Sequence, residues 1–346
     1  MDRVAARLDA AISDMPSAPA PEETAGAFAV GRDGDAVPAA LRGAILAIGN
    51  FDGVHRGHRA LIEIAIREGR ARRAPAAVLT FEPHPRKFFA PDKPLFRLTP
   101  EPAKLAVFRK LGLDGAFVRR FDAGLAGTSA AAFVERLLGQ ELGASGVVVG
   151  HDFHFGRGRQ GTPALLEALC REKGWACVIV PPVTSGGASI SSGAVRAALE
   201  RGDIAGANAL LGHRWFVQGE VRHGDKRGRT LSFPTANIRL SDECALQHGI
   251  YAVRAAVAPG EVYGGVASFG RRPTFDNGAP LLEVHLFDFA GDLYGRSLDV
   301  EFVDWIRAEE RFASAEALVA RMNEDARLAR IMLAEVPVCS LQSLIG

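Results

Sequence analysis

Two histidines three residues apart, His55 and His58, stand in a glycine-rich stretch of the chain. Imidazole nitrogens donate hydrogen bonds to phosphate oxygens, and this spacing lets both rings face one phosphate. The stretch follows an apolar run at residues 44–48 and precedes apolar residues at helical spacing over 61–66, so we expect it to join a buried strand to a helix. The free N–H groups at the start of that helix also suit phosphate.

Three glycines in this stretch, Gly49, Gly53 and Gly57, let the backbone come close to a ligand. The pattern favours phosphate binding, and a tight turn with surface histidines and a metal-binding pair stay open as alternatives. No third ligand follows at zinc-like spacing, which weakens the metal interpretation. A Walker A loop is excluded because the Gly-Lys-Ser/Thr ending is missing.

The composition is that of an ordinary globular protein of about two domains. The chain has 346 residues, of which 48% are hydrophobic and 23% charged. The formal net charge of +1 gives no support for nucleic acid or a membrane as partner. No apolar run approaches membrane length, and the four cysteines form no metal-like or paired spacing, so we expect a reduced, cytoplasmic protein.

The first half of the chain is expected to form an α/β domain. Residues 1–40 lack a signal-peptide core and read as a poorly structured N-terminal extension. Over residues 41–209, strand patterns such as 76–81 and 146–150 alternate with helical ones, which predicts a doubly wound parallel sheet. A helix at 99–111 is expected to bury its apolar face, formed by Leu105, Phe108 and Leu111.

Three segments in this domain stand where the sheet would present a ligand site. Glu-Pro-His-Pro at 82–85 and an acidic, aromatic segment at 151–158 both follow strands, and rigid or hairpin-like turns are their alternatives. In the third segment, Ser191 or Ser192 can cap a helix whose first turns carry Arg196. That arrangement suits a clamp on phosphates, or else a plain helix cap with a solvated arginine.

Over residues 210–346, strands alternate with glycine and charged turns and lack crossover helices, which predicts a small antiparallel barrel closed by a helix capped at Ser314. Gly224 and Lys226 lie in a segment that suits a flap over phosphates. Thr235 and Asn237 would share one side of an extended chain, and their oxygens suit Mg²⁺. A charged hairpin followed by an edge strand is the alternative.

These motifs together carry a resemblance to a known family. Residues 49–58 resemble the nucleotidyltransferase motif of the prokaryotic bifunctional riboflavin kinase/FAD synthetases, and their His-x-Gly-His core is shared by the wider class of adenylyl and cytidylyl transferases. Phe-Pro-Thr-Ala-Asn at 233–237 is similar to the motif of riboflavin kinases, and Leu-Glu-x-His-Leu-Phe-Asp-Phe at 282–289 to a further motif of the family. The resemblance covers about residues 41–335, with its motifs in the family's order.

The resemblance implies a set of site residues in each domain. For the first domain it implies ATP contacts at Gly49, Phe51, Asp52, Gly53, Ser191 and Ser192, charge stabilisation by His55, His58 and Arg196, and flavin contacts at Phe89, Asp152 and Phe155. For the second it implies ATP contacts at Gly224, Lys226, Thr235 and Asn237, Mg²⁺ held with Thr235 and Asn237, Glu283 as general base, and a structural role for His285.

The implied function is FAD synthesis in two steps. The barrel would phosphorylate riboflavin with ATP to FMN, and the first domain would adenylate FMN with a second ATP to FAD and pyrophosphate. Gly193 stands where the family has Thr, and Ser232 where it has Gly. The alternatives are therefore that one activity is lost or that the chain is a non-catalytic flavin-binding regulator. An RNA-binding role is disfavoured because the charge is balanced and no basic stripe occurs.

Overall fold

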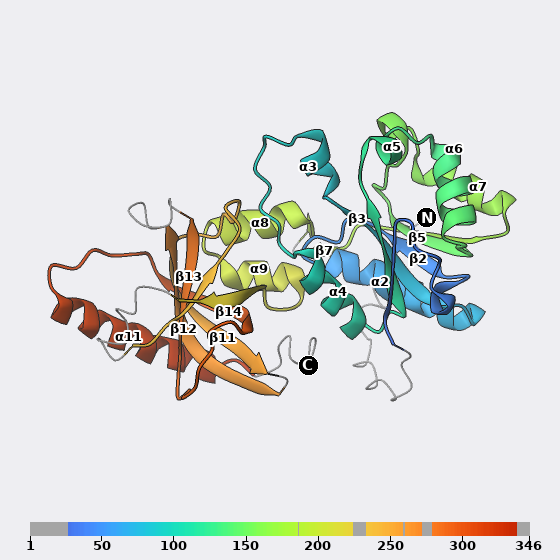
Figure 1. Cartoon of the computed structure of the whole chain (residues 1–346). Helices are drawn as coiled ribbons and strands as arrows, with labels where there is room; N and C mark the ends of the chain where they lie inside the picture. Colours follow the sequence, from blue (N-terminus) through green and yellow to red (C-terminus); the bar gives the residue numbers. More distant parts are fainter. Residues whose placement is uncertain (1–26, 186, 224–232, 259, 272–278, 338–346) are drawn as a thin grey trace.

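The computed structural model describes residues 27–185, 187–223, 233–258, 260–271 and 279–337. Within these ranges the chain forms a parallel six-stranded sheet covered by helices, followed by a closed antiparallel six-stranded barrel with a C-terminal helix (Figure 1). The predicted fold class is confirmed.

The sheet has strand order β1-β4-β3-β2-β5-β6, and every pair is parallel. Its strands are β1 (Ala29–Arg32), β2 (Ile45–Ile48), β3 (Ala76–Glu82), β4 (Gly115–Arg120), β5 (Gly146–Gly150) and β6 (Ala176–Val180). The helices between them include α2 (Arg56–Arg72), α3 (Pro85–Phe89), α4 (Glu101–Lys110), α5 (Ala123–Ala126), α6 (Ala130–Ala132) and α7 (Pro163–Glu172).

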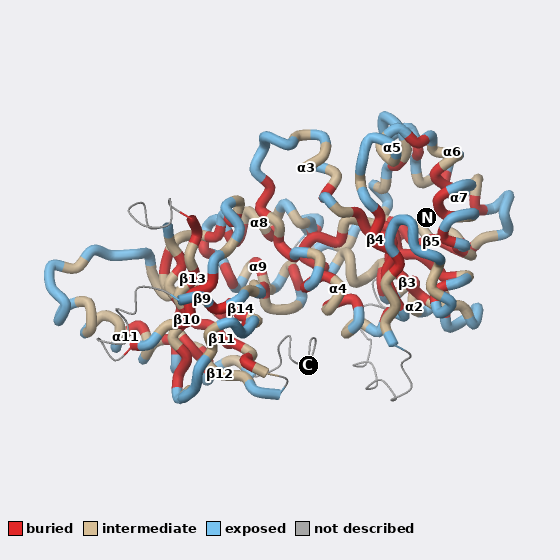
Figure 2. The backbone as a smooth tube through the Cα atoms, in the orientation of Figure 1, coloured by how far each residue is buried: buried red, intermediate tan, exposed pale blue. Residues whose placement is uncertain are grey.

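The central strand β2 explains why helices cover both faces. Its four residues are all buried, and the strands of this sheet are drawn mostly in the colour of buried residues in Figure 2. Ile45 and Ala47 point into the core formed with α2 and α4, whereas Leu46 and Ile48 point into the core on the opposite face. A strand that is apolar on both sides must be covered on both sides, as in doubly wound sheets.

The structure corrects the expectation that residues 1–40 are poorly structured throughout. Residues 1–26 lie outside the described residues, but Ala29–Arg32 form the edge strand β1, which pairs in parallel with β4. Gly31 fits there because a Cβ atom would lie 2.8 Å from the ring of Phe117. The strand adds backbone hydrogen bonds at a sheet edge, and such pairing needs no apolar periodicity in the sequence.

The buried face of α4 also differs from the prediction. Phe108 is buried as expected, and Leu105 and Leu111 are partly buried against the same core. The buried face also includes Ala103, Lys104 and Val107, and the lysine was not predicted as a core residue. Its burial matters for the site described below.

The barrel closes in the strand order β10-β13-β12-β11-β14-β9, and every pair is antiparallel. Its strands are β9 (Phe216–Arg222), β10 (Ala236–Arg239), β11 (Gly249–Ala258), β12 (Glu261–Arg271), β13 (Pro280–Leu286) and β14 (Ser297–Arg307). Helix α11 (Ala315–Ala334) begins at the predicted cap Ser314 and packs against β11, β12 and β14. The Arg254 guanidinium from β11 donates to the Leu333 and Val336 carbonyls at the end of α11.

Two helices, α8 (Ser192–Glu200) and α9 (Ile204–Leu211), lie between the sheet and the barrel (Figure 1). Their apolar residues, including Val195 and Ile204, share one core with barrel residues such as Phe302. The two parts of the molecule are therefore packed together through these helices. The domain limits at residue 40 and near residue 210 stay a prediction.

Candidate active sites

The histidine-containing loop lies at the carboxyl end of β2, between the ends of β3 and β5. The connection reverses direction across the sheet at this strand, and open α/β sheets bind ligands at such a point. Two residues of the loop have left-handed backbones, Phe51 at φ 51° and Val54 at φ 42°. This conformation is costly for a β-branched residue, so the surrounding structure must hold the loop in place.

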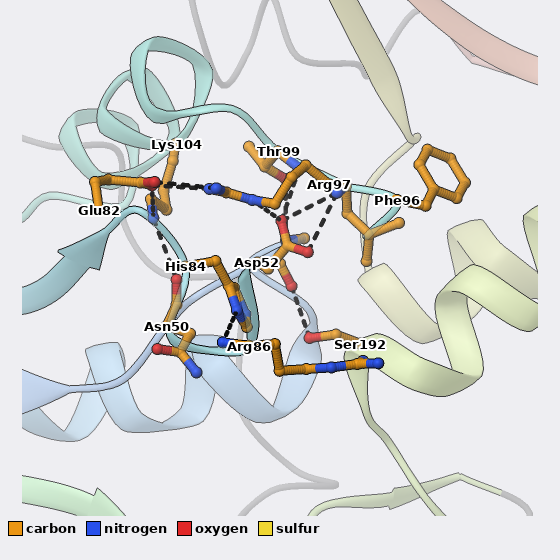
Figure 3. A network of polar contacts seen from close by, with 12 residues as sticks. Asn50, Asp52, Glu82, His84, Arg86, Phe96, Arg97, Thr99, Lys104 and Ser192 are labelled. Carbon is orange, nitrogen blue, oxygen red and sulfur yellow. Dashed lines mark hydrogen bonds and ion pairs between the residues drawn. The ribbon is translucent and has the colours of Figure 1, made fainter. Parts of the chain in front are cut away.

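Asp52 is the anchor of the loop. Its carboxylate, only 1% exposed, accepts hydrogen bonds from the backbone N–H groups of Leu98 and Thr99, each at 3.0 Å (Figure 3). It also forms an ion pair with Arg196 and lies 3.7 Å from Arg97 Nε. The protein itself thus surrounds the Asp52 carboxylate, which fixes the loop on this side.

A buried lysine holds the other side of the loop. Lys104 Nζ donates to the Asn50 carbonyl at 3.2 Å, to Thr80 Oγ1 at 3.1 Å and to Glu82 Oε1 at 2.9 Å (Figure 3). Glu82 receives two further hydrogen bonds from Arg97, at 2.8 and 3.0 Å. Burial lowers the pKa of Lys104, and the partners compensate for its desolvation.

Sequence reasoning missed Arg97, Thr99 and Lys104 as parts of this site. Arg97 and Thr99 stand in a loop with no recognisable motif, so no local signal pointed to them. Lys104 did leave a signal, because it stands beside Ala103 and three residues before Val107 on the apolar face of its helix. A lysine on a buried face needs a partner, which the neighbouring strand supplies through Glu82.

The structure brings His55 and His58 together, as their spacing predicted. His55 caps α2 and its Nδ1 accepts the backbone N–H of His58 at 3.3 Å, while the two rings stack with centroids 3.7 Å apart. An imidazole that accepts at Nδ1 carries its proton on Nε2 when neutral, so His55 is a donor through Nε2. His58 Nδ1 is buried and finds no hydrogen-bond partner among the described residues.

Both histidines are neutral at pH 7. Burial lowers the pKa of His55 to about 4, and burial also lowers the pKa of His58 well below its usual value. His84, at the loop after β3, is likewise buried, and burial lowers its pKa to about 4. These rings can therefore donate hydrogen bonds to an anion without carrying charge themselves.

The serine motif is tied to the same loop. Ser191 caps α8, accepting the Ala194 N–H at 3.2 Å, and Ser192 Oγ donates to the Asp52 carbonyl at 2.9 Å. Arg196 Nε donates to the Phe96 carbonyl at 2.6 Å, and its Nη2 contacts Asp52. The predicted cap is confirmed for Ser191, and Arg196 is held by protein groups beside the loop.

The three predicted flavin residues have different surroundings. Phe89 is 69% exposed on α3 and contacts Phe88 and Phe121, with ring centroids 5.2 and 5.6 Å away. Asp152 is exposed just after β5. Phe155 is buried and packs against the ring of Phe153 at 5.4 Å, so its ring belongs to the core. Flavin contact stays a prediction for all three.

The barrel brings Thr235, Asn237 and Glu283 to one place. Asn237 and Glu283 stand directly opposite one another on β10 and β13, so their side chains share a face. This is the face away from the interior, which Leu282 and Val284 fill as predicted. Asn237 Nδ2 donates to the Thr235 carbonyl at 3.3 Å. Gly224, Lys226 and Ser232 lie outside the described residues.

His285 contacts the segment that leads into β10, and its structural role stays a prediction. Its Nδ1 lies 2.9 Å from the Pro234 carbonyl, which can only accept, so Nδ1 is the donor. Its ring packs against Phe233 with centroids 4.9 Å apart. His285 therefore fixes the residues just before Thr235 and Asn237 against β13.

The buried neutral histidines predict a loss of stability in acid. The pKa values of His55 and His84 are about 4 in the fold, below the 6.5 of free histidine, so between these values only the unfolded chain binds their protons. The free energy of unfolding should have its highest value above pH 6.5 and should decrease as the pH falls toward 4. The decrease should be up to about 3 kcal/mol for each of the two histidines. Urea unfolding at pH 7.5, 5.5 and 4.5 measures this. A His55→Gln/His84→Gln variant with an unchanged pH slope would contradict it.

Gly193, where the family resemblance implies Thr, is expected to accept a side chain. A Cβ atom there would meet nothing closer than Ser191 Oγ at 3.6 Å, which is ordinary contact. Gly193→Ala should raise the free energy of unfolding by about 0.4–1 kcal/mol because glycine loses more backbone freedom on folding. Thermal unfolding tests this, with Gly212→Ala as the opposite control. Gly212 has φ +75° and its added Cβ would lie 2.9 Å from Arg56 Cγ, so that variant should be less stable.

Among the described residues, no helix is both long and apolar enough to cross a membrane. In the same part of the chain, no three His, Cys, Asp or Glu side chains gather as a metal-binding group.

Comparisons with known proteins agree with the two-part architecture. The family model for FAD synthetase matches residues 37–194, and that for riboflavin kinase matches residues 211–333. The crystal structure named macrolide-efflux protein from Streptococcus pneumoniae has a similar fold, with a TM-score of 0.75 and 30% identity, covering 84% of this chain and 94% of that one.

Curated relatives span nearly the same length. The chain is 43% identical over 288 residues to the bifunctional riboflavin kinase/FMN adenylyltransferase of Escherichia coli, covering 83% of this chain and 92% of that protein. It is 37% identical to the protein of the same name from Bacillus subtilis, covering 81% of this chain and 90% of that one. With both family models matched in order, the chain belongs to the bifunctional riboflavin kinase/FMN adenylyltransferase family.

Proposed function

We propose that the chain makes FAD from riboflavin in two steps, each at one of the sites described above. In the barrel, the 5′-hydroxyl of the ribityl chain attacks the γ-phosphorus of ATP and yields FMN and ADP. Glu283 accepts the proton of that hydroxyl as general base. The observation that carries this step is the register of Glu283 with Asn237 across β10 and β13.

The donors around Glu283 fit Mg²⁺. Thr235 and Asn237 offer a hydroxyl and an amide oxygen, and Mg²⁺ prefers oxygen ligands and retains waters and substrate phosphates. One or two protein ligands suffice for Mg²⁺ when the ATP phosphates and waters supply the others, so the barrel site needs no cluster of carboxylates. Mg²⁺ would neutralise charge on the ATP phosphates, which Gly224 and Lys226 would also contact. The ion and these contacts are proposals for the barrel.

In the sheet domain, the phosphate of FMN attacks the α-phosphorus of a second ATP, and pyrophosphate leaves. The reaction needs no protein nucleophile, so catalysis rests on positioning and on stabilising charge. His55 would donate through Nε2 and His58 through a ring nitrogen, beside the N-terminus of α2. His58 Nδ1 is buried and has no hydrogen-bond partner among the residues that the structure describes, which supports a ligand atom as its partner.

The remaining site residues would act in two ways. Gly49, Gly53, Ser191 and Ser192 form the loops that surround the ATP phosphates. Phe51, Asp52 and Arg196 are buried or engaged with protein groups, so we infer that they shape the ATP site from behind. Phe89 and Asp152 would contact the flavin, and Phe155 would support that surface from the core. The substrates are all small molecules.

A chromatographic time course with riboflavin, ATP and Mg²⁺ tests both steps on one chain. FMN should appear first and FAD later, with pyrophosphate released in proportion to FAD. FMN that accumulates without FAD, even when FMN and ATP are supplied, would contradict the second step. Riboflavin that stays bound without either product would contradict both and favour a flavin-binding regulator.

A further inference from the structure

Residues 96–99, which we name the strap, lie between the two domains. Alternate side chains of the strap belong to different parts of the molecule. Phe96 and Leu98 enter the core that α8 and α9 share with the barrel. Arg97 pairs with Glu82, and Thr99 Oγ1 accepts the N–H of Gly53 at 3.0 Å. The strap therefore contacts both the barrel core and the histidine-containing loop.

On the barrel side, the strap is held by Trp215. The indole Nε1 donates to the Leu98 carbonyl at 3.0 Å, and the ring packs edge-on against Phe96 with centroids 5.7 Å apart. Trp215 is only 2% exposed and stands just before β9. Its backbone N–H donates to Asn208 Oδ1 of α9, and its carbonyl accepts from the N–H of Phe302 in the barrel strand β14. Trp215 is therefore fixed between α9 and the barrel.

On the other side, the same peptide group reaches the loop. The peptide unit between Leu98 and Thr99 accepts from Trp215 through its carbonyl and donates to Asp52 through its N–H at 3.0 Å. A peptide unit is planar, so its two ends cannot turn independently. Hydrogen bonds joined through one amide also polarise each other. The position of Trp215 is therefore transmitted to the Asp52 carboxylate through one rigid group.

We propose that Trp215, the residue just before the first barrel strand, is a positioning residue for adenylyl transfer in the sheet domain. It acts through the Leu98–Thr99 peptide and Asp52 on the loop that carries His55 and His58. The inference rests on the proposed adenylyltransferase function of that loop. By this inference, a residue of the kinase domain helps to position the loop for adenylyl transfer in the sheet domain. Trp215 would do so without contacting the substrates.

The test is Trp215→Phe in the full-length chain, which keeps an aromatic ring and removes the indole N–H. We expect kcat for FAD formation from supplied FMN and ATP to fall about five-fold, the effect of one hydrogen bond, with KM for FMN within about two-fold. The rate of riboflavin phosphorylation should stay at the parental value. Trp305→Phe is the matched control, because the Trp305 indole nitrogen has no hydrogen-bond partner among the described residues. That variant should leave both rates unchanged.

A second variant tests the route through the strap. Thr99→Val removes the hydroxyl that accepts from Gly53, so it loosens the same loop. If both residues act on that loop, the loss in the double variant should be smaller than the product of the two single losses. A loss of kcat in the double variant equal to the product of the two single losses would overturn the route through the strap. A parental kcat in Trp215→Phe would overturn the inference. An equal fall in both activities would also overturn it, since Trp215 would then only stabilise the fold. Absence of FAD formation by the parental chain would instead refute the proposed function.

Discussion

Glu283→Gln is expected to lower the rate of FMN formation by about 10²–10⁴-fold, the usual contribution of a general base. The variant keeps the shape and the strand pairing of Glu283 with Asn237 but cannot take up the proton of the attacking hydroxyl. Steady-state phosphorylation of riboflavin with ATP, followed by chromatography, measures this loss. The loss should lie in kcat, because the missing interaction forms only in the transition state.

Two comparisons keep this prediction specific. The rate of FAD formation from supplied FMN should stay at the parental value in Glu283→Gln, since the adenylyl site is built from other elements. Glu261→Gln removes the same charge from an exposed glutamate at the start of β12 and should affect neither rate. Loss of both activities in Glu283→Gln, or a kinase rate near the parental one, would contradict the assignment of Glu283 as base.

His58→Ala is expected to have the opposite effect, lowering FAD formation from FMN by about 10²–10³-fold, the typical cost of removing one donor to developing charge. The ring of His58 stacks on His55 and lies 5.1 Å from that of Phe51, so it is held in place before substrate arrives. Its loss removes a fixed donor at the start of α2. The measurement is the initial rate of FAD and pyrophosphate formation at saturating FMN and ATP.

His58→Asn is the matched variant for this prediction. Its amide keeps a hydrogen-bond donor on a shorter side chain, so it should recover part of the rate lost in His58→Ala. Phosphorylation of riboflavin should be parental in both variants. The phosphate role of His58 is refuted if His58→Ala makes FAD at the parental rate, or if asparagine and alanine lower it equally.

The charge that would attract phosphates to this loop does not come from the histidines. His55, His58 and His84 are neutral at pH 7 because burial lowers their pKa values. The buried network beside them instead joins three cations, Arg97, Lys104 and Arg196, to two carboxylates, Asp52 and Glu82. This excess of cations, together with the N-terminus of α2, favours an anion at the loop.

The fold class and the kind of site could be predicted from local patterns in the chain. The strands β2 and β5 are short apolar runs and the barrel strand β13 alternates apolar and polar residues, so local patterns were sufficient to predict them. His55 and His58 met as predicted because they are three residues apart at a helix start, and such spacing fixes their geometry locally. Asn237 and Glu283 are far apart in the chain. They were assigned to one site because each stands in a short motif that resembles the same family.

The groups that hold these residues in place could be found only in the folded molecule. Arg97, Thr99 and Lys104 reach the loop from segments that are 45 or more positions away in the chain, and no local periodicity encodes such a contact. The same holds for Trp215, which meets Leu98 across the two domains. Phe155 was predicted to lie near the flavin from its motif, and only the structure shows that its ring packs in the core. Local sequence sets the secondary structure and the spacing of residues within one motif. Long-range packing sets which side chains from distant segments meet at the loop.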